Sequence, residues 1–448
     1  MMGEGSTFEY EDGKREMLDA DRAKLLLSKL LEVERLSSLE CVNLSGKSIG
    51  DSASSVVGEA LALVVKHSPL VKLSLADIIA GRPEDEALRV LNVLSESIAS
   101  EDSLSIKCLD LSDNALGAKG VAACEALLTK AAPNLNHLYF CNNGLAADAG
   151  SLITKILTCG STRNTQLETL HFFNNLLESA GAIALSPLIS SSPELVDFRF
   201  SSLRVSSEGA EHISKALLNC SKLESLDLSD NTFGLNASKI LAKALQKMSA
   251  LKTLNMRDTS IGDSGAKLIC KTLVQYCPQI EKLDLSANEL TVASVKGGLA
   301  VAVSGLPKLK VLLVEENELG SKGGSRLAEA IVLSSSDEKL GLEELSLNVN
   351  EMGDRAAQSW MRVGEILPHL KKLGLNGNAF GEECVEELKR VFDDSILGSM
   401  SDNDEDLAEE EESEEEDEEE ENEASSNAYE EETGDDDIDD LISKTEKM

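Results

Sequence analysis

One short pattern returns throughout this chain of 448 residues and constrains its fold more than any other feature. Its clearest copy is Leu109–Gly117, which reads Leu-Asp-Leu-Ser-Asp-Asn-Ala-Leu-Gly. Most successive copies lie 28 or 29 residues apart, so the chain is built from stacked copies of one unit. Twelve residues share the register of the asparagine in that pattern: Lys47, Ile78, Asn114, Asn143, Asn175, Leu203, Asn231, Thr259, Asn288, Asn317, Asn350 and Asn378.

Each unit combines a strand pattern with a helix pattern. Leu226-Asp227-Leu228 alternates with a period of two, which predicts a strand, and Gly265, Ile269 and Leu273 follow at the spacing of a helix face. These features define a leucine-rich repeat. We therefore expect an α/β solenoid of the long-repeat, ribonuclease-inhibitor-like type, with about twelve repeats, a curved parallel sheet inside and helices outside. The recurring asparagines are expected to bond to the backbone of the turn that leaves each strand.

The ends of the array differ in composition from its body. Residues 1–35 are expected to form an amino-terminal segment with a capping helix over 18–35, because Leu25, Leu26 and Leu30 give that stretch an apolar face. The repeat domain then covers 36–395. Residues 396–448 form an acidic tail that is expected to be disordered, since residues 401–448 hold 26 acidic and 2 basic residues and cannot bury a core.

Charge and composition exclude several classes of protein. The net charge is −38, and the first 400 residues still hold 54 acidic against 40 basic residues, so no basic nucleic-acid surface is expected. No apolar run approaches the ~20 residues of a membrane span, and Met1–Met17 lacks the apolar core of a signal peptide. Nine scattered cysteines without a C-x-x-C pair are typical of the reduced thiols of an intracellular protein.

The sequence offers little catalytic chemistry of its own. Its five histidines lie in different repeats and form no metal-binding motif, so neither a metal nor another cofactor is expected. Ser45–Ser48 resembles the end of a phosphate-binding loop, but Cys41 stands where the first glycine of that motif belongs. We therefore expect Lys47 to lie on the turn of the first repeat.

The second repeat has the most unusual loop. It lacks the asparagine and is followed by the longest step, 36 residues, which enlarges the loop that leaves its strand. Insertions of this kind are common binding elements of repeat proteins. Arg82 stands on this loop between Gly81 and Pro83, and we expect its side chain to be exposed there. A single loop arginine is more often a solubilising charge than a functional group.

The same loop carries a family resemblance. Asp77–Leu88 resembles the signature of the Ran GTPase-activating proteins, especially the plant form, and Leu109–Gly117 and Leu138–Leu145 resemble that family's third and fourth repeats. The family likewise ends in an acidic tail. The Trp-Pro-Pro mark of the plant form's amino-terminal targeting domain does not occur here, so plant-type targeting is not expected.

The resemblance implies a function exerted on another protein. It implies an activator that completes the active site of the GTPase Ran, in its GTP-bound form, and so supports nucleocytoplasmic transport, rather than an enzyme acting alone. The implied partner is Ran, with or without a Ran-binding protein. The chain is expected to be a monomer in the cytoplasm, including the outer face of the nuclear envelope.

The resemblance also assigns residues. The family's essential arginine falls on Arg82 and its functional asparagine on Asn142. Asn143 is in register with the recurring asparagines and should point into the repeat, whereas Asn142 precedes that register and should be exposed. Whether Arg82 reaches the nucleotide or orients the GTPase stays open. Further GTPase-binding positions are Asp77, Glu84, Asp85, Asp113, Asn114 and Asn174.

Two alternatives involve binding without activation. An acidic leucine-rich nuclear phosphoprotein also joins repeats to an acidic tail and binds basic partners such as histones, but it has fewer and shorter repeats. An inhibitor-like scaffold shares the long repeat and leaves the Gly81-Arg82 loop unexplained.

Overall fold

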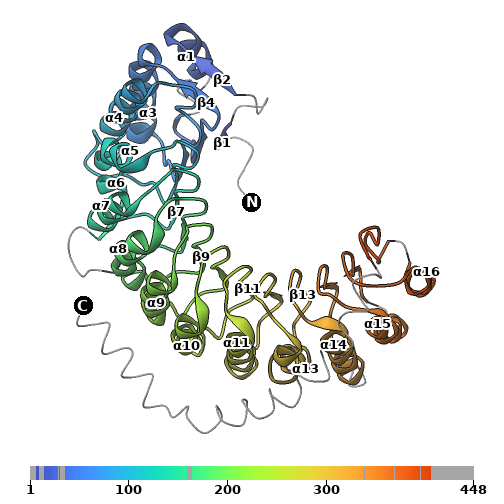
Figure 1. Ribbon diagram of the computed structural model, residues 1–448. Coiled ribbons are helices and arrows are strands. Elements are labelled where there is room, and N and C mark those ends of the chain that lie inside the picture. Colours follow the sequence, from blue (N-terminus) through green and yellow to red (C-terminus); the bar gives the residue numbers. More distant parts are fainter. Residues whose placement is uncertain are drawn as a thin grey trace. The chain divides into compact units, whose positions relative to one another are not determined.

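The computed structural model describes residues 7–9, 15–28, 30, 36–158, 164–335, 340–367, 369–393 and 395–404. The chain divides into two units, one up to Leu223 and one from Glu224 onward. Within each unit the strands form a parallel sheet and the helices lie along one side of it (Figure 1). The predicted α/β leucine-rich repeat fold is therefore confirmed.

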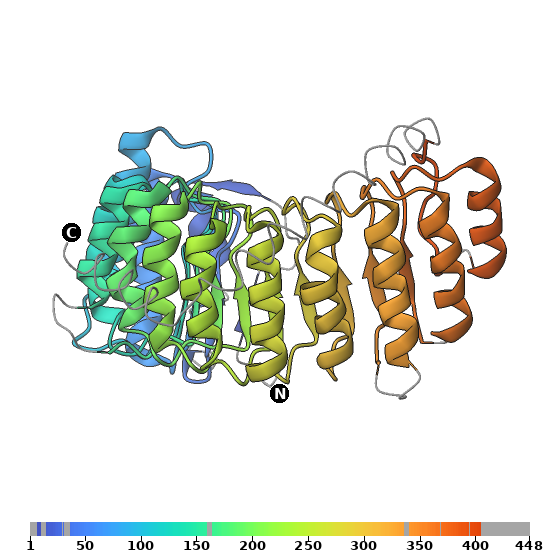
Figure 2. The same ribbon diagram turned by 60° about the horizontal axis from the view of Figure 1, so that its bottom comes forward.

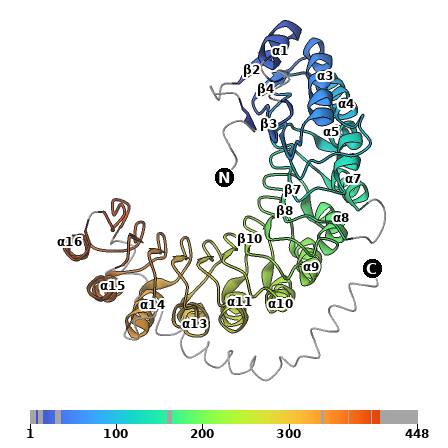
Figure 3. The same cartoon turned by 180° about the vertical axis from the view of Figure 1, so that it is seen from behind.

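The first unit contains a main sheet with the strand order β1-β3-β5-β6-β7-β8-β9 and a separate pair, β2-β4. Figure 3 shows α3, α4, α5 and α7 together on one side of these strands. The elements are β1 (Thr7–Phe8), β2 (Glu16–Leu18), α1 (Ala20–Leu27), β3 (Cys41–Asn43), β4 (Lys47–Ile49), α3 (Asp51–His67), β5 (Lys72–Ser74), α4 (Glu84–Ile98), β6 (Cys108–Asp110), α5 (Gly117–Ala123), α6 (Glu125–Ala131), β7 (His137–Tyr139), α7 (Ala147–Leu157), β8 (Thr169–His171), α8 (Glu178–Ser190), β9 (Asp197–Arg199), α9 (Ser207–Ala216) and the 3-10 helix η1 (Leu217–Asn219).

The second unit runs in chain order from β10 to β15, and all these strands are parallel. Figure 2 shows its helices, yellow to red, standing next to one another in a single layer. The elements are β10 (Ser225–Asp227), α10 (Gly234–Leu245), β11 (Thr253–Asn255), α11 (Gly262–Tyr276), β12 (Lys282–Asp284), α12 (Val292–Ser294), the π-helix η2 (Val295–Leu299), α13 (Ala300–Gly305), β13 (Val311–Leu313), α14 (Gly320–Ser335), β14 (Glu344–Ser346), α15 (Asp354–Ile366), β15 (Lys372–Gly374) and α16 (Glu382–Val391).

The core of each unit follows from the register of its strands. The central residue of each strand pairs with the central residue of the next, as Leu109 does with Leu138 and Leu254 with Leu283. These four leucines are fully buried, and the helices cover them with the glycine and apolar positions predicted from the sequence, such as Gly265 and Ile269. Burial of about 25 cal/mol per Å² of apolar surface makes this stacking the main stabilising force.

The recurring asparagines form a buried ladder between repeats. Asn143 Oδ1 accepts from the Asn114 backbone N–H at 2.9 Å, and Asn175 Oδ1 accepts from the Asn143 N–H at 3.0 Å. Their amide nitrogens donate to carbonyls such as Leu111 O, at 2.9 Å from Asn143 Nδ2. The second unit repeats this arrangement at Asn288 and Asn317. The prediction that these asparagines bond to turn backbone is confirmed.

The residue before each ladder position, here called the turn position, has a left-handed backbone. Its φ lies between 51° and 62° in ten repeats, where the residues are Asp77, Asp113, Asn142, Asn174, Ser202, Asp230, Asp258, Ala287, Glu316 and Val349. Gly46 and Gly377 occupy it in two others. Asn, Asp and Gly tolerate this conformation best, so the choice of residue is partly a backbone requirement.

The amino-terminal end adds strands that the sequence patterns did not predict. β1 extends the main sheet beside β3, and β2 pairs with β4. Part of the capping helix predicted over 18–35 is observed as α1, which begins after the N-cap Asp19, ends at Leu27 and buries Leu26 and Leu27. Leu18 belongs to β2 instead, and residues 29 and 31–35 lie outside the described residues. The placement of Lys47 on a turn was wrong, because this lysine lies in β4 with 1% exposure and its ammonium is 3.9 Å from the Glu16 carboxylate.

The carboxy-terminal end extends past the boundary expected at residue 395. Leu397 bridges to Leu373 in parallel fashion and, like Met400, is buried. Asn403 Oδ1 accepts from the Asn378 N–H at 2.8 Å and so adds one more rung to the asparagine ladder. Residues 395–404 therefore cap the last repeat. The remainder of the expected acidic tail, from residue 405, lies outside the described residues.

Candidate functional site

The Gly81-Arg82 loop connects β5 to α4 in the first unit. Gly81 has φ +74°, and a Cβ placed on it would meet no atom within 4 Å. The backbone conformation, rather than a lack of space, therefore favours glycine at this position. Pro83 follows at the N-cap of α4, where a proline cannot cost a helical hydrogen bond. The loop thus turns sharply at Gly81 and enters the helix one residue after Arg82.

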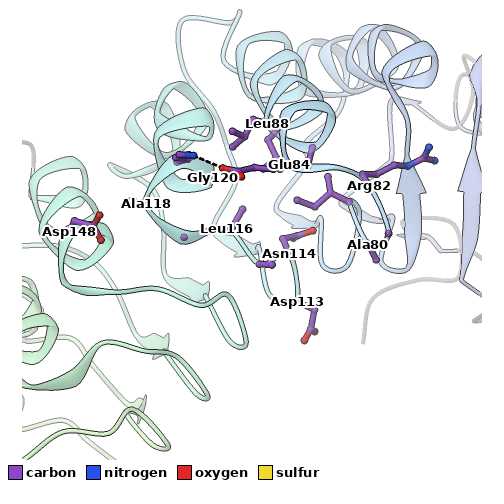
Figure 4. Close-up of a pocket in the computed structure, with 17 residues that line it drawn as sticks. Ala80, Arg82, Glu84, Leu88, Asp113, Asn114, Leu116, Ala118, Gly120 and Asp148 are labelled. Carbon is purple, nitrogen blue, oxygen red and sulfur yellow. Dashed lines mark hydrogen bonds and ion pairs between the residues drawn. The ribbon is translucent and has the colours of Figure 1, made fainter.

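The side chain of Arg82 is not the exposed loop charge that the sequence suggested. It is only 13% exposed and is directed into the first repeat. Its Nε donates to Ser48 Oγ at 3.0 Å, and its Nη2 donates to the carbonyl oxygens of Ser48 at 2.7 Å and Leu18 at 3.4 Å. In Figure 4 this side chain points away from Asp113 and Asn114. The expectation of exposure was wrong because strands β2 and β4 offer carbonyl acceptors that the loop sequence cannot reveal.

The start of helix α3 leaves room for this guanidinium. Glu86 accepts from Arg82 Nη1 at 3.5 Å, one turn further along α4. A Cβ on Gly50, the N-cap residue of α3, would lie 2.8 Å from Arg82 Nη1. A side chain at Gly50 would therefore displace the guanidinium. Arg82 is held from three directions by β4, β2 and α4.

A row of exposed polar side chains crosses the next three turns. Asn142 Nδ2 donates to Asp113 Oδ1 at 2.8 Å, and Asn174 Nδ2 donates to Asn142 Oδ1 at 3.0 Å. We call Asp113, Asn142 and Asn174 the turn row. Asp77 occupies the same turn position one repeat earlier, but its carboxylate is bound by Arg15. Three of the predicted GTPase-contacting residues are therefore linked by hydrogen bonds along one edge of the first unit.

Asn142 and Asn143 have the different environments that the repeat register predicted. Asn142 is exposed on the turn, whereas Asn143 is fully buried in the ladder, where it bonds to the backbone of Asn114 and Leu111. The functional role given to Asn142 stays a prediction, but its side chain is accessible to a partner.

Asn114, which was expected to bind a GTPase, lies in the buried ladder rather than on the exposed turn. Its side chain is 2% exposed. Its Nδ2 donates to Leu75 O at 2.7 Å, and its Oδ1 accepts from the Ile78 N–H at 2.9 Å. Asn114 is thus a rung of the ladder, and its amide is bound to the backbone of its own and the preceding repeat.

A groove of about 620 Å³ lies beside the turn row, between α4 and α5. Its walls include Glu84, Asp113, Lys119 and Asp148 (Figure 4). Lys119 Nζ lies 2.6 Å from Glu84 Oε1, and this hydrogen bond raises the pKa of Lys119. Apolar residues also line the groove: Ile79, Ala87, Leu88, Leu91 and Leu116.

The groove brings together only part of the predicted site. Arg82, Glu84, Asp113 and Asn114 line it, whereas Asp77, Asp85, Asn142 and Asn174 do not. Asp85 is exposed in the first turn of α4. Asn142 reaches the groove indirectly, through its bond to Asp113.

Cys141 stands beside Asn142 at this edge, and its thiol is partly buried. Burial raises the pKa of the Cys141 thiol, which precedes Asn142, so this cysteine is protonated near neutral pH. Among the described residues no three His, Cys, Asp or Glu side chains are arranged to hold a metal ion. In that same part of the chain, no helix has the length and apolar character needed to cross a membrane.

Three residues of the site were missed by sequence reasoning. Arg15 contacts Asp77, and Ser48 and Glu86 contact Arg82. Glu86 belongs to the quoted family signature but was not singled out, whereas Arg15 and Ser48 belong neither to that signature nor to the repeat pattern. Arg15 and Ser48 lie 62 and 34 residues from the groups they contact, so no local signal marks them.

Comparisons with known proteins agree with the fold and point to one family. The family model described as "Leucine Rich repeat" matches residues 102–123, 219–236 and 247–270. RAN GTPase-activating protein 2 of Arabidopsis thaliana is 39% identical over 132 residues, which is 30% of this chain and 23% of that protein. The Ran GTPase-activating protein of Drosophila melanogaster is 36% identical over 304 residues, 66% of this chain and 50% of that protein. Ran GTPase-activating protein 1 of Saccharomyces cerevisiae is 31% identical over 164 residues, which is 35% of this chain and 39% of that protein. The matched parts thus span a quarter to a half of these relatives.

Proposed function

We propose that this chain, a leucine-rich repeat protein of the Ran GTPase-activating protein family, stimulates GTP hydrolysis by Ran. The carrying observation is that Arg82 and Asp113 line one groove of the first unit and that Asp113 binds the exposed Asn142, in a chain whose reported relatives in plants, fly and yeast are named as activators of Ran. The binding-only alternatives are not favoured, because the reported relatives are named as activators of Ran.

The chain acts on the active site of its partner rather than through one of its own. A GTPase needs its attacking water oriented and the charge on the transferring phosphoryl group stabilised. The contacts of Arg82 with Ser48 and Leu18 support the route in which Arg82 orients the GTPase rather than reaching its nucleotide, with the guanidinium itself held inside the activator. In that route Arg82 fixes the 77–83 loop, and the exposed Asn142 contacts the GTPase and holds its own catalytic groups in place.

Several finer points belong to the same proposal. The chain binds Ran in the GTP-bound form, with or without a Ran-binding protein, and it acts as a monomer. Its site of action is the cytoplasm, including the outer face of the nuclear envelope, where hydrolysis by Ran supports nucleocytoplasmic transport. No cofactor is needed beyond those that the GTPase itself carries.

A multiple-turnover assay tests the proposal most directly. Purified Ran loaded with GTP is mixed with catalytic amounts of the chain, and phosphate release is followed against Ran alone. A second small GTPase loaded with GTP serves as the specificity control. We expect acceleration for Ran only. Hydrolysis at the intrinsic rate of Ran would falsify the proposal.

A further inference from the structure

The amino-terminal segment 15–18 lies against the two residues that begin and end the Gly81-Arg82 loop region, Asp77 and Arg82. Arg15 binds the Asp77 carboxylate through both Nε and Nη2, at 2.9 and 2.7 Å. Three residues later, the carbonyl of Leu18 accepts from Arg82 Nη2 at 3.4 Å. One short segment therefore contacts both ends of the loop.

This segment is itself firmly attached to the first repeat. β2 pairs in parallel with β4, the Glu16 N–H donates to Gly46 O, and the Gly50 N–H donates to Leu18 O, both at 3.1 Å. Leu18 and Ile49 are buried, with 2% and 0% exposure. The segment is thus fixed to the first repeat by backbone hydrogen bonds and by the burial of Leu18.

β4 completes the contact with the loop through Ser48. Ser48 Oγ donates to Ala80 O at 2.6 Å and accepts from Arg82 Nε at 3.0 Å, so one buried hydroxyl binds both the backbone and the side chain of the loop. The Ile49 N–H donates to Ile78 O at 2.7 Å. We call residues 15–18 together with β4 the amino-terminal brace.

We infer that the amino-terminal brace positions the GTPase-binding loop 77–83, with Arg15 and Ser48 as its positioning residues. This inference rests on the proposed function, because it concerns the same edge. A loop that is already ordered need not lose its conformational freedom when the partner binds. When the brace is loosened, the loop loses conformational entropy on binding instead, and this raises the KM for GTP-bound Ran. At saturation the partner orders the loop, so kcat changes little.

Arg15 is the residue whose removal tests this with the least damage to the fold. Its side chain is 64% exposed, so Arg15→Ala buries no new polar group. We expect a rise in KM of about three- to fivefold, the range of one well-formed charged contact, with kcat within about twofold of the unchanged chain. Arg15→Lys keeps the charge without the two-pronged geometry and should give an intermediate KM.

The second unit offers a matched control. Arg257 pairs with Glu316, which occupies the turn position of its own repeat with φ 53°, just as Asp77 does with φ 55°. Arg257→Ala therefore removes the same kind of contact where no GTPase-binding loop is proposed, and both kinetic constants should stay unchanged. A KM for Arg15→Ala equal to that of the unchanged chain, or an equal rise in Arg257→Ala, would overturn the inference.

Hydrogen exchange separates this inference from the proposed function, because it needs no partner. The amides of Asp77, Ile78 and Arg82 donate to Ser112 O, Asn114 Oδ1 and Ile79 O, and so report on the loop. In Arg15→Ala and Ser48→Ala they should exchange several-fold faster, with the exchange of β7 and β8 unchanged. If the loop amides exchange at the original rate, the brace does not order the loop, whether or not the chain activates Ran.

Discussion

Two sets of turns, from Asp77 to Asn174 in the first unit and from Ala287 to Val349 in the second, share a backbone conformation but differ in side chains. From Asp77 to Asn174 the turn position holds only Asp and Asn, whereas the repeats of Ala287, Glu316 and Val349 place two apolar residues and a glutamate there at nearly the same φ. The stacked repeats impose the left-handed turn in both regions. The linked turn row is therefore not required by the fold, and its polar side chains are free to serve a partner.

The second region also contains a residue that is strained by the left-handed backbone. Val349 has φ 56° and is 49% exposed, so a β-branched residue sits in a conformation that it rarely adopts, with no burial to offset the strain. Asn142 adopts nearly the same angle, φ 53°, with a side chain that tolerates it.

The largest effect is expected at Arg82, which lies on the enlarged loop that follows the turn of Asp77 in the first unit. Arg82→Ala should lower kcat/KM for GTP-bound Ran on the order of a hundredfold, because it removes several of the contacts that fix the 77–83 loop, and each contact is expected to contribute about three- to fivefold. It should also lower the free energy of unfolding by about 1–3 kcal/mol, because the Ser48 carbonyl loses a buried donor. Phosphate release and urea unfolding measure the two effects. An unchanged unfolding midpoint would mean that the contacts of Arg82 with β2 and β4 contribute no stability.

The next largest effect is on stability, at Asn143. Asn143→Ala should cost about 3 kcal/mol, since it removes the side-chain acceptor of the Asn114 N–H and one of the two amide donors to Leu111 O, all of them buried. Urea denaturation measures this loss. The hydrolysis rate per folded molecule should persist at temperatures where the variant stays folded. Asn288→Ala is the matched ladder variant of the second unit and should cost a similar amount.

Asn142 separates side-chain chemistry from backbone strain. Asn142→Gly removes the exposed amide while keeping a residue suited to φ 53°, so stability should change by less than about 1 kcal/mol. Activation of Ran should fall by at least about tenfold, the effect of losing one good polar contact. Titration of GTP-bound Ran at fixed activator gives the rate constants. Full activity in Asn142→Gly would remove the turn row from the proposed site.

Val349 provides the converse substitution in the second unit. Val349→Asn should raise the free energy of unfolding by about 1 kcal/mol, because it relieves the left-handed strain. Asn142→Val should lower it by a similar amount. Thermal unfolding of the two variants tests whether the same backbone requirement acts in both regions. A melting temperature of Val349→Asn at or below that of the unchanged chain would contradict the strain argument.

The smallest effect is expected from the acidic residues that follow the carboxy-terminal cap, which belong to neither of the two compared sets of turns. Truncation after Asp404 keeps Asn403 on the ladder and removes 24 acidic and two basic residues. Association with GTP-bound Ran should slow by a few-fold, and the deficit should shrink as salt rises, because such charge acts over about 8 Å at physiological ionic strength. Stopped-flow association at low and high salt measures it. Equal rates for both chains would leave the tail with a role in solubility only.

The periodic part of this protein was predictable from its sequence because each repeat contains its own signals. The alternating leucines, the helix spacing and the ladder asparagines lie within one unit of about 28 residues, and the environments of Asn142 and Asn143 followed from register alone. The same register also places Asn114 on the ladder, although this residue was expected to bind the GTPase. A ladder position is a packing requirement whatever the function.

The surroundings of Arg82 were decided only by the tertiary structure. The sequence marked its loop by the missing asparagine and the long step, but the groups that hold Arg82 belong to β2 and β4, with Leu18 64 residues away. Likewise, Asn403 continues the ladder, although the sequence around it resembles the acidic tail that follows. Contacts between repeats depend on which side chains the stacking brings within about 3 Å, and these pairs share no local pattern. The sequence thus determined the solenoid and the location of its unusual loop, while stacking determined that Arg82 is held inside and Asn142 is exposed.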